Sequence, residues 1–316
     1  MSSVALIDPM TLLGEELRER LEQRPDLALD LRLLSADEDQ VGALTTVGGA
    51  AAMVGKAEGD DLANLDLAIF CGSDLRLLAD LPPAATAIVA SPGTPVDEAI
   101  PVIAGVNESR AERGRRLLSP HPSAVLLGHL LGPLASFAPQ SIVATLIEPA
   151  SIYGKQGLDD LFDQARALVA LTQVPTTETF ERQLAFNLYP ATSPGEGIAD
   201  ELRAALSRDD LALRLQRLQA PVFHGISVHL TVELDGPWSL QEVSEALAAH
   251  PWNELAEDGD RIGPIDAANH ESVLIGGLAQ SGERHFGLWA VMDNLTRGGA
   301  LNMLRILDLL SGGTAS

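Results

Sequence analysis

The sequence contains only one cysteine, Cys71, among its 316 residues. A single thiol cannot form an internal disulfide, and it cannot supply a zinc site built from several cysteines. We therefore expect neither a disulfide framework nor a metal site.

Positive charge is also scarce, since 21 Lys and Arg stand against 44 Asp and Glu and the formal net charge is -23. A surface of this kind repels phosphate backbones and anionic membranes. Long apolar runs are missing too, because none reaches the roughly 18–20 residues that a membrane helix needs. Met1 leads directly into the strand-like segment 4–7, without the features of a signal peptide. We expect a cytoplasmic protein with no nucleic-acid or membrane partner.

What the sequence does contain is enough apolar material for a large core. Hydrophobic residues make up 46% of the chain, and its length suggests two domains of ordinary size. In the first third, short apolar segments predict buried strands at 4–7, 29–34, 65–70 and 87–90. Leucines at 12, 13, 17 and 21 follow the spacing of an amphipathic helix. Strands that alternate with helices in this way predict a parallel α/β sheet.

The pattern changes after about residue 138. Strands are predicted at 141–147, 222–233, 273–278 and 286–292, and helices at 157–171, 239–249 and 298–310. Ser239 and Glu242 have the spacing of a capping box at the start of the second of these helices. We expect an N-terminal Rossmann-like domain over 1–120, completed by a C-terminal helix at 296–312, and an α+β domain over 121–295.

Four segments resemble motifs of the aspartate-semialdehyde dehydrogenase family. Residues 293–302 (DNLTRGGALN) resemble its DNLxKGAAxN signature, and residues 183–190 (QLAFNLYP) resemble QxAFNxxP. Residues 151–157 (SIYGKQG) resemble SGAGKxG, and residues 220–223 (APVF) resemble the VPV strand that carries the catalytic histidine. The motifs follow one another in the order of that family. The resemblance implies an NAD(P)-binding-type domain and a dimerisation domain, and therefore a homodimer.

The positions that carry the chemistry of that family are replaced in this chain. Residues 120–124 (PHPSA) resemble the segment Pro-Asn-Cys-Ser/Thr, which places Pro122 where the nucleophilic cysteine belongs. The catalytic base falls on Ile226, the glutamine that orients it on Glu148, and the arginine that binds the substrate carboxylate on Gln219. Neither proline nor isoleucine can attack a carbonyl or accept a proton. We therefore predict that this catalytic site is degenerate.

The dinucleotide turn is degenerate as well. The family sequence GATGAVG falls on residues 8–14 (DPMTLLG), so Asp8 and Thr11 replace two glycines and only Gly14 is retained. Those glycines allow the backbone to approach the pyrophosphate closely, whereas Asp8 brings a carboxylate there. We expect no cofactor, with weak or absent NAD(P) binding, and we expect Asp8 to cap the helix that follows.

Two residues are candidates for a relocated catalytic group. Cys71 follows a predicted strand, and His224 lies two residues before Ile226 on one face of the strand predicted at 222–233. A small buried residue and a half-buried structural histidine are the alternative interpretations. His229 points to the opposite face from His224, which argues against a joint metal site.

Three functions stay open at this point. The first is a catalytically silent paralogue, of a kind that proteobacteria carry, which binds a small molecule or a protein. The second is an NAD(P)-dependent aldehyde oxidoreductase with relocated catalytic groups, linked to amino-acid biosynthesis. The third is a structural partner of a true dehydrogenase subunit.

Overall fold

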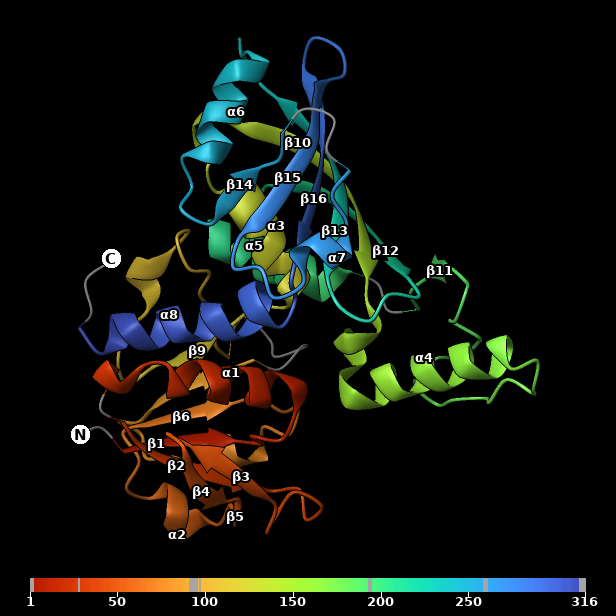
Figure 1. Ribbon diagram of the computed structural model, residues 1–316. Coiled ribbons are helices and arrows are strands. Elements are labelled where there is room, and N and C mark those ends of the chain that lie inside the picture. Colours follow the sequence, from red (N-terminus) through yellow and green to blue (C-terminus); the bar gives the residue numbers. More distant parts are fainter. Residues whose placement is uncertain are drawn as a thin grey trace. The chain divides into compact units, whose positions relative to one another are not determined.

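The computed structural model describes residues 3–27, 29–90, 96, 98–192, 195–257 and 261–312 (Figure 1). It divides into two compact units. Unit 1 comprises Met1–His121, Ala204–Leu206 and Gly298–Ser316, and unit 2 comprises Pro122–Arg203 and Ser207–Arg297. The predicted boundary between residues 120 and 121 lies one residue from this division.

Unit 1 is built on a seven-stranded sheet of order β5-β2-β1-β6-β7-β9-β8, and every pairing in it is parallel. Its strands are β1 (Ser3–Ile7), β2 (Asp30–Ser35), β5 (Gly55–Lys56), β6 (Leu67–Phe70), β7 (Thr86–Val89), β8 (Ile100–Pro101) and β9 (Arg116–Leu118). A separate antiparallel hairpin consists of β3 (Leu44–Val47) and β4 (Ala50–Met53). The central strands β6 and β7 are buried at every position, because both faces of the sheet are covered. The predicted Rossmann-like α/β class is confirmed.

Helix α8 (Leu301–Leu310) packs beside α1 (Leu12–Glu22) on one face of this sheet, although the two helices lie at opposite ends of the chain (Figure 1). Its residues Met303, Ile306 and Leu307 are buried in the same cluster as Leu6 and Leu17. The Arg24 guanidinium adds a bidentate ion pair with Asp308, at 2.8 and 3.1 Å. A short helix, α2 (Gly59–Leu62), contributes to the core on the other face.

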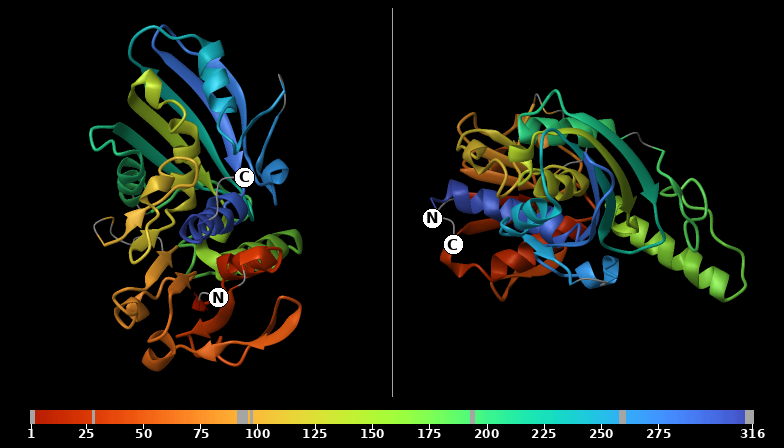
Figure 2. Two further views of the ribbon diagram at one scale, coloured as in Figure 1. Left: turned by 90° about the vertical axis from the view of Figure 1, so that its left-hand side faces the viewer. Right: turned by 90° about the horizontal axis from the view of Figure 1, so that it is seen from above.

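Unit 2 is built on a seven-stranded mixed sheet of order β11-β12-β10-β13-β16-β15-β14. Its strands are β10 (Pro139–Glu148), β11 (Tyr189–Pro190), β12 (Ala212–Gln219), β13 (Ile226–Leu234), β14 (Asn253–Leu255), β15 (Val273–Gln280) and β16 (His285–Met292). Its helices are α3 (Pro122–Leu131), α4 (Gly154–Val169), α5 (Glu196–Leu206, to Arg203 in this unit), α6 (Leu240–Ala248) and α7 (Pro264–Ala267). Helix α4 extends away from the sheet of its own unit (Figures 1 and 2).

Several boundaries differ from the predicted ones for physical reasons. The strand predicted to begin at 222 begins at Ile226, because Gly225 has φ +90° and breaks the extended backbone. The last helix begins at Leu301 and is preceded by a π-helical turn at Thr296–Ala300. The capping box of Ser239 and Glu242 is confirmed. None of the helices in the described part of the chain is long and apolar enough to cross a membrane.

Candidate functional site

The segment that resembles the family's nucleophile loop opens helix α3 of unit 2. Pro122 is the first residue of this helix. Proline suits that position because the first helical N–H has no partner within the helix, and its fixed φ matches the helical backbone. The next residue, Ser123, is fully buried, and its hydroxyl donates a hydrogen bond to Oε1 of Glu148 at 3.1 Å. A proline that starts a helix has a structural role and offers no atom for acyl chemistry.

Glu148, at the end of β10, is held by an arginine that the sequence analysis did not identify. Arg217 lies on the neighbouring strand β12, and its Nη2 donates to Oε2 of Glu148 at 2.7 Å. Its Nε lies 3.0 and 3.1 Å from the two carboxylate oxygens. The Glu148 side chain is 0% exposed and that of Arg217 is 11% exposed. A bidentate arginine–carboxylate pair of this geometry is among the strongest polar contacts in proteins.

Gln219, where the family resemblance places an arginine, contacts the backbone of Glu148. Its Nε2 donates to the carbonyl oxygen of Glu148 at 3.1 Å, and its Oε1 has no hydrogen-bond partner among the described residues. Gln219 is two residues beyond Arg217, so both side chains leave the same face of β12. That spacing is the signal in the sequence that would have identified Arg217 as a relocated cation.

Ile226, at the position of the base, is fully buried at the start of β13. The antiparallel pairing of Ile147 with Ser227 places it beside Glu148 on the neighbouring strand. The site therefore brings together Pro122, Glu148, Gln219 and Ile226, with Ser123 and Arg217 added. In this site Arg217 and Glu148 form a buried ion pair beside the apolar side chain of Ile226, which cannot accept a proton.

His224 does not share a strand face with Ile226, so that expectation is wrong. It lies in the bend before β13, because the positive φ of Gly225 separates it from the strand, and its side chain is half-buried. A Cβ on Gly225 would lie 3.0 Å from the side chain of Pro264, so glycine is required there for space as well as for φ.

The family-like motif at 293–302 builds the surroundings of this bend. Oδ1 of Asn294 accepts from the Gly225 N–H at 2.9 Å, and its Nδ2 donates to the Ser151 hydroxyl at 3.0 Å. Oδ1 of Asp293 accepts from the N–H groups of Leu295 and Thr296. These contacts join the motifs at 293–302 and 151–157 to the bend that follows the motif at 220–223, so the motifs position the backbone independently of any catalytic group.

In unit 1, the turn after β1 has two positions whose backbone favours glycine, Asp8 and Gly14. Asp8 has φ +57°, which is a glycine-like conformation. Gly14 is needed because a Cβ there would lie 2.7 Å from the Asp8 carbonyl oxygen. The N-cap of α1 is Thr11, whose Oγ1 accepts from the Gly14 N–H at 3.1 Å. The prediction that Asp8 caps this helix is therefore wrong, because its side chain turns away from the helix.

The Asp8 carboxylate is directed toward the ends of the neighbouring strands. Its Oδ1 accepts from the Ser35 hydroxyl at 2.6 Å, and its Oδ2 occupies the space that a side chain on Gly72 would need. Burial raises the pKa of Asp8 above its usual value, and the like charges of Asp74 and Asp37 raise it further, against the lowering effect of the Ser35 bond. A buried carboxylate in this place does not fit a dinucleotide, whose pyrophosphate is itself an anion.

Cys71, the other surrogate candidate, follows β6 and is 7% exposed. Burial raises the pKa of its thiol, and the nearby Asp8 raises it further. The thiolate is the reactive form of cysteine, so this environment weighs against a nucleophilic role. Among the residues that the structure describes, no group of three or more His, Cys, Asp and Glu side chains is placed to hold a metal ion.

Comparison with known proteins places these observations in a family. The model of the semialdehyde dehydrogenase dimerisation domain matches residues 131–297. The aspartate-semialdehyde dehydrogenase of Synechocystis is 25% identical over 97% of this chain and 96% of its own. A USG-1 protein homolog of Azotobacter vinelandii is 27% identical over 97% of each chain. The structure of a probable aspartate-semialdehyde dehydrogenase from Pseudomonas aeruginosa has a TM-score of 0.89 at 26% identity, covering 98% of both chains.

A more distant likeness, at 12% identity and a TM-score of 0.74, is to a Candida albicans aspartate-semialdehyde dehydrogenase whose structure was determined with NADP. At that identity the likeness shows the fold alone. NADP binding is therefore a property of that relative.

Proposed function

Because the chain belongs to the semialdehyde dehydrogenase family, we propose that it is a divergent, catalytically silent paralogue that acts by binding. The observation that carries the proposal is the buried Arg217–Glu148 pair beside Ser123. Glu148 stands where the family resemblance places the group that orients the base, and Arg217 lies two residues before Gln219, where the resemblance places the substrate clamp. Its charges satisfy each other, so neither is available to a substrate.

The missing reactive groups support the same conclusion. Thiol acyl chemistry needs a nucleophile and a base within hydrogen-bond reach of each other. Pro122 begins a helix, and Ile226 lies in an apolar core. Restoring one group leaves the other absent, so a single reversion does not recover the reaction.

The cofactor proposal follows from the turn in unit 1. We infer that NAD(P) binding is weak or absent, because the Asp8 carboxylate fills the space between β1, β2 and β6. The alternative, an NAD(P)-dependent aldehyde oxidoreductase that uses Cys71 or His224, is weakened by the buried, high-pKa thiol and by the place of His224 outside the strand.

The partner proposal rests on unit 2. We infer a homodimer, because more than half of the chain matches a domain named for dimerisation in this family. Light scattering at micromolar concentration tests this, and a monomer mass would contradict it.

The enzymatic test compares this protein with a catalytically active relative under the same conditions. We expect no oxidation of aspartate semialdehyde with NADP and phosphate, and none after Pro122→Cys. Calorimetry should show no heat with NAD or NADP. Turnover that survives repurification, or a dissociation constant below about 10 μM for either dinucleotide, would overturn the proposal.

A further inference from the structure

The segment 110–116 of unit 1 (RAERGRR) is an exception in an acidic chain. It contains four arginines and one glutamate within seven residues, whereas the whole chain has 44 acidic and 21 basic residues. Opposite charges attract an anion from solution to such a segment, while an acidic surface elsewhere repels it. The segment is therefore the place to look for a ligand of negative charge.

A cavity of about 120 Å³ lies beside this segment. Its lining consists of six apolar residues, one glycine and two arginines: Leu78, Leu81, Pro82, Pro83, Ala85, Ala87, Gly114, Arg115 and Arg116. It lies at the amino ends of β7 and β9, whereas the Asp8 turn and Cys71 follow the carboxyl ends of β1 and β6. In a parallel sheet these are opposite edges, so the cavity is separate from the degenerate dinucleotide turn.

The backbone around this cavity is held in place before any ligand arrives. The Ala85 N–H bonds to the Pro82 carbonyl at 2.9 Å, and the Ala87 N–H bonds to the Arg115 carbonyl at 3.1 Å. The Gly114 N–H bonds to the Thr86 hydroxyl at 2.9 Å, and its φ of +71° favours glycine. A site that is already ordered loses less conformational entropy on binding.

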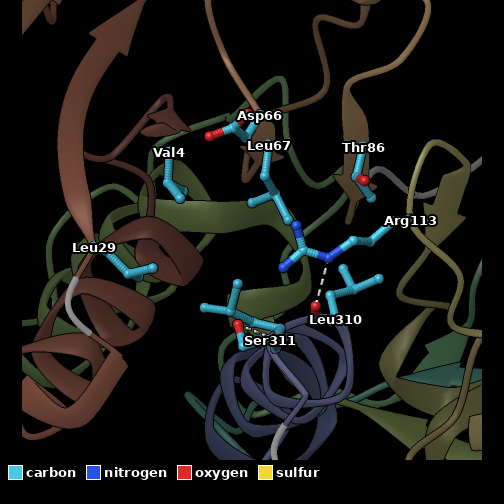
Figure 3. A pocket seen from close by; sticks show the side chains of 9 residues that line it. Val4, Leu29, Asp66, Leu67, Thr86, Arg113, Leu310 and Ser311 are labelled. Atoms are coloured by element: carbon cyan, nitrogen blue, oxygen red, sulfur yellow. Dashed lines mark hydrogen bonds between the residues drawn. The ribbon is translucent and has the colours of Figure 1, made fainter. Parts of the chain in front are cut away.

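The arginines of this segment differ in whether another group of the protein already holds their guanidinium. Arg113 has a structural role, because its Nε donates to the Leu310 carbonyl at 2.7 Å and so caps the end of α8 (Figure 3). The pocket around Arg113 measures about 20 Å³, which is room for a water molecule or two. Arg115 makes only a 3.6 Å contact with Glu112, at about 60% exposure of both side chains, and Arg116 has no ion pair among the described residues.

We propose that the cavity beside Arg115 and Arg116 binds a small anion that carries a compact apolar group. A guanidinium offers a planar fork of donors that matches the oxygens of a carboxylate or a phosphate. Pro82, Pro83 and Leu81 form an apolar wall on which a ring or a branched alkyl group packs. An engineered cavity of about 150 Å³ binds benzene, so the volume suits a group of that size. This inference is independent of the loss of catalysis proposed above.

The experiment separates the two halves of the ligand with three probes. Phenyl phosphate carries both the anion and the ring, inorganic phosphate carries the anion alone, and benzyl alcohol carries the ring alone. Binding to the full chain is measured by titration calorimetry at constant ionic strength. We expect phenyl phosphate to bind at least about tenfold more tightly than either single-feature probe, because both contacts contribute to one affinity.

The variants assign that binding to this cavity. Arg115→Gln with Arg116→Gln should weaken phenyl phosphate about tenfold. Leu81→Ser should weaken phenyl phosphate and leave inorganic phosphate unchanged. Arg32→Gln with Arg214→Gln is the matched control, because both are exposed strand arginines outside this segment and their joint loss changes the net charge by the same amount. Circular dichroism confirms that each variant is folded.

Three results would overturn the proposal. The first is no binding of phenyl phosphate beyond that of inorganic phosphate. The second is equal weakening by the Arg32/Arg214 control pair and by the Arg115/Arg116 pair, which would indicate general electrostatics. The third is arginine-dependent binding of a hexaglutamate peptide without binding of phenyl phosphate, which would indicate a protein partner.

Discussion

The buried pair of Arg217 and Glu148 makes a quantitative prediction about the stability of unit 2. In Arg217→Met the Glu148 carboxylate, which is 0% exposed, loses three contacts to the guanidinium and keeps the Ser123 hydroxyl. Removing one partner of a buried pair leaves an uncompensated charge and costs about 3–5 kcal/mol. We expect a loss in this range in the free energy of unfolding of unit 2.

A second variant separates the charge from the shape of the site. The double variant Glu148→Gln, Arg217→Met has no buried charge, and its glutamine can still accept from Ser123. We expect it to be about 2 kcal/mol more stable than Arg217→Met, because replacing both partners of a buried pair is far less costly than removing one. The matched control is Arg214→Met on the same strand, whose side chain is exposed and whose loss should fall within about 0.5 kcal/mol of the wild type.

The assay is urea unfolding followed by tryptophan fluorescence. Trp238, Trp252 and Trp289 all lie in unit 2, so the signal reports on that unit alone. A loss below about 1 kcal/mol for Arg217→Met would refute the reasoning, since the carboxylate would then be solvated or satisfied by another group. Equal losses for Arg217→Met and Arg214→Met would refute it as well.

Three further predictions address other residues. Asp8 has a raised pKa in the folded protein, so its ionisation destabilises unit 1 as the pH rises above 3.8 and through the folded pKa. Asp8→Asn should therefore raise the melting temperature at pH 7 in calorimetry, and this gain should vanish at low pH. A variant that is less stable than the wild type at pH 7 would contradict this. His129 is fully buried, and its pKa lies well below 6.5, first because of burial and then because of Arg297 and His250. Unit 2 should therefore lose stability as the pH falls below 6.5, and His129→Phe should reduce that loss. An unchanged pH profile of stability, followed by fluorescence, would count against this. Gly225→Ala should cost about 1–3 kcal/mol, more than Gly154→Ala, because both have positive φ but only Gly225 also meets Pro264; equal costs in urea would exclude the steric part.

Much of the fold was predictable because it depends on local patterns. The apolar segments 4–7 and 65–70 correspond to strands β1 and β6, and the Ser239 capping box begins α6. Periodicity gave no sign that the strand predicted at 222 begins at Ile226, because that depends on the positive φ of Gly225, whose N–H is bonded to the distant Asn294. Backbone geometry of this kind is set by distant residues, which a single sequence does not place side by side.

The site divides in the same way. The loss of the nucleophile and the base is a matter of residue identity at Pro122 and Ile226, and it can be inferred from the motifs. What fills the site depends on tertiary pairing: Arg217 reaches Glu148 across 69 residues of chain. In the turn of unit 1, the sequence predicted Asp8 as the cap, but its carboxylate accepts from the Ser35 hydroxyl on another strand and the Thr11 hydroxyl caps the helix instead.

The return of α8 to unit 1 determines when this protein can finish folding during its synthesis. Asp308 meets Arg24 across 284 residues, so the core beneath α1 stays open until α8 has left the ribosome. Unit 2 is complete at Arg297 and its sheet has no need of that last helix, so it can form first, which reverses the usual order from the N-terminus. Until then Leu6 and Leu17 lack their α8 neighbours, so a nascent chain stalled before residue 301 exposes apolar surface that chaperones bind and proteases attack.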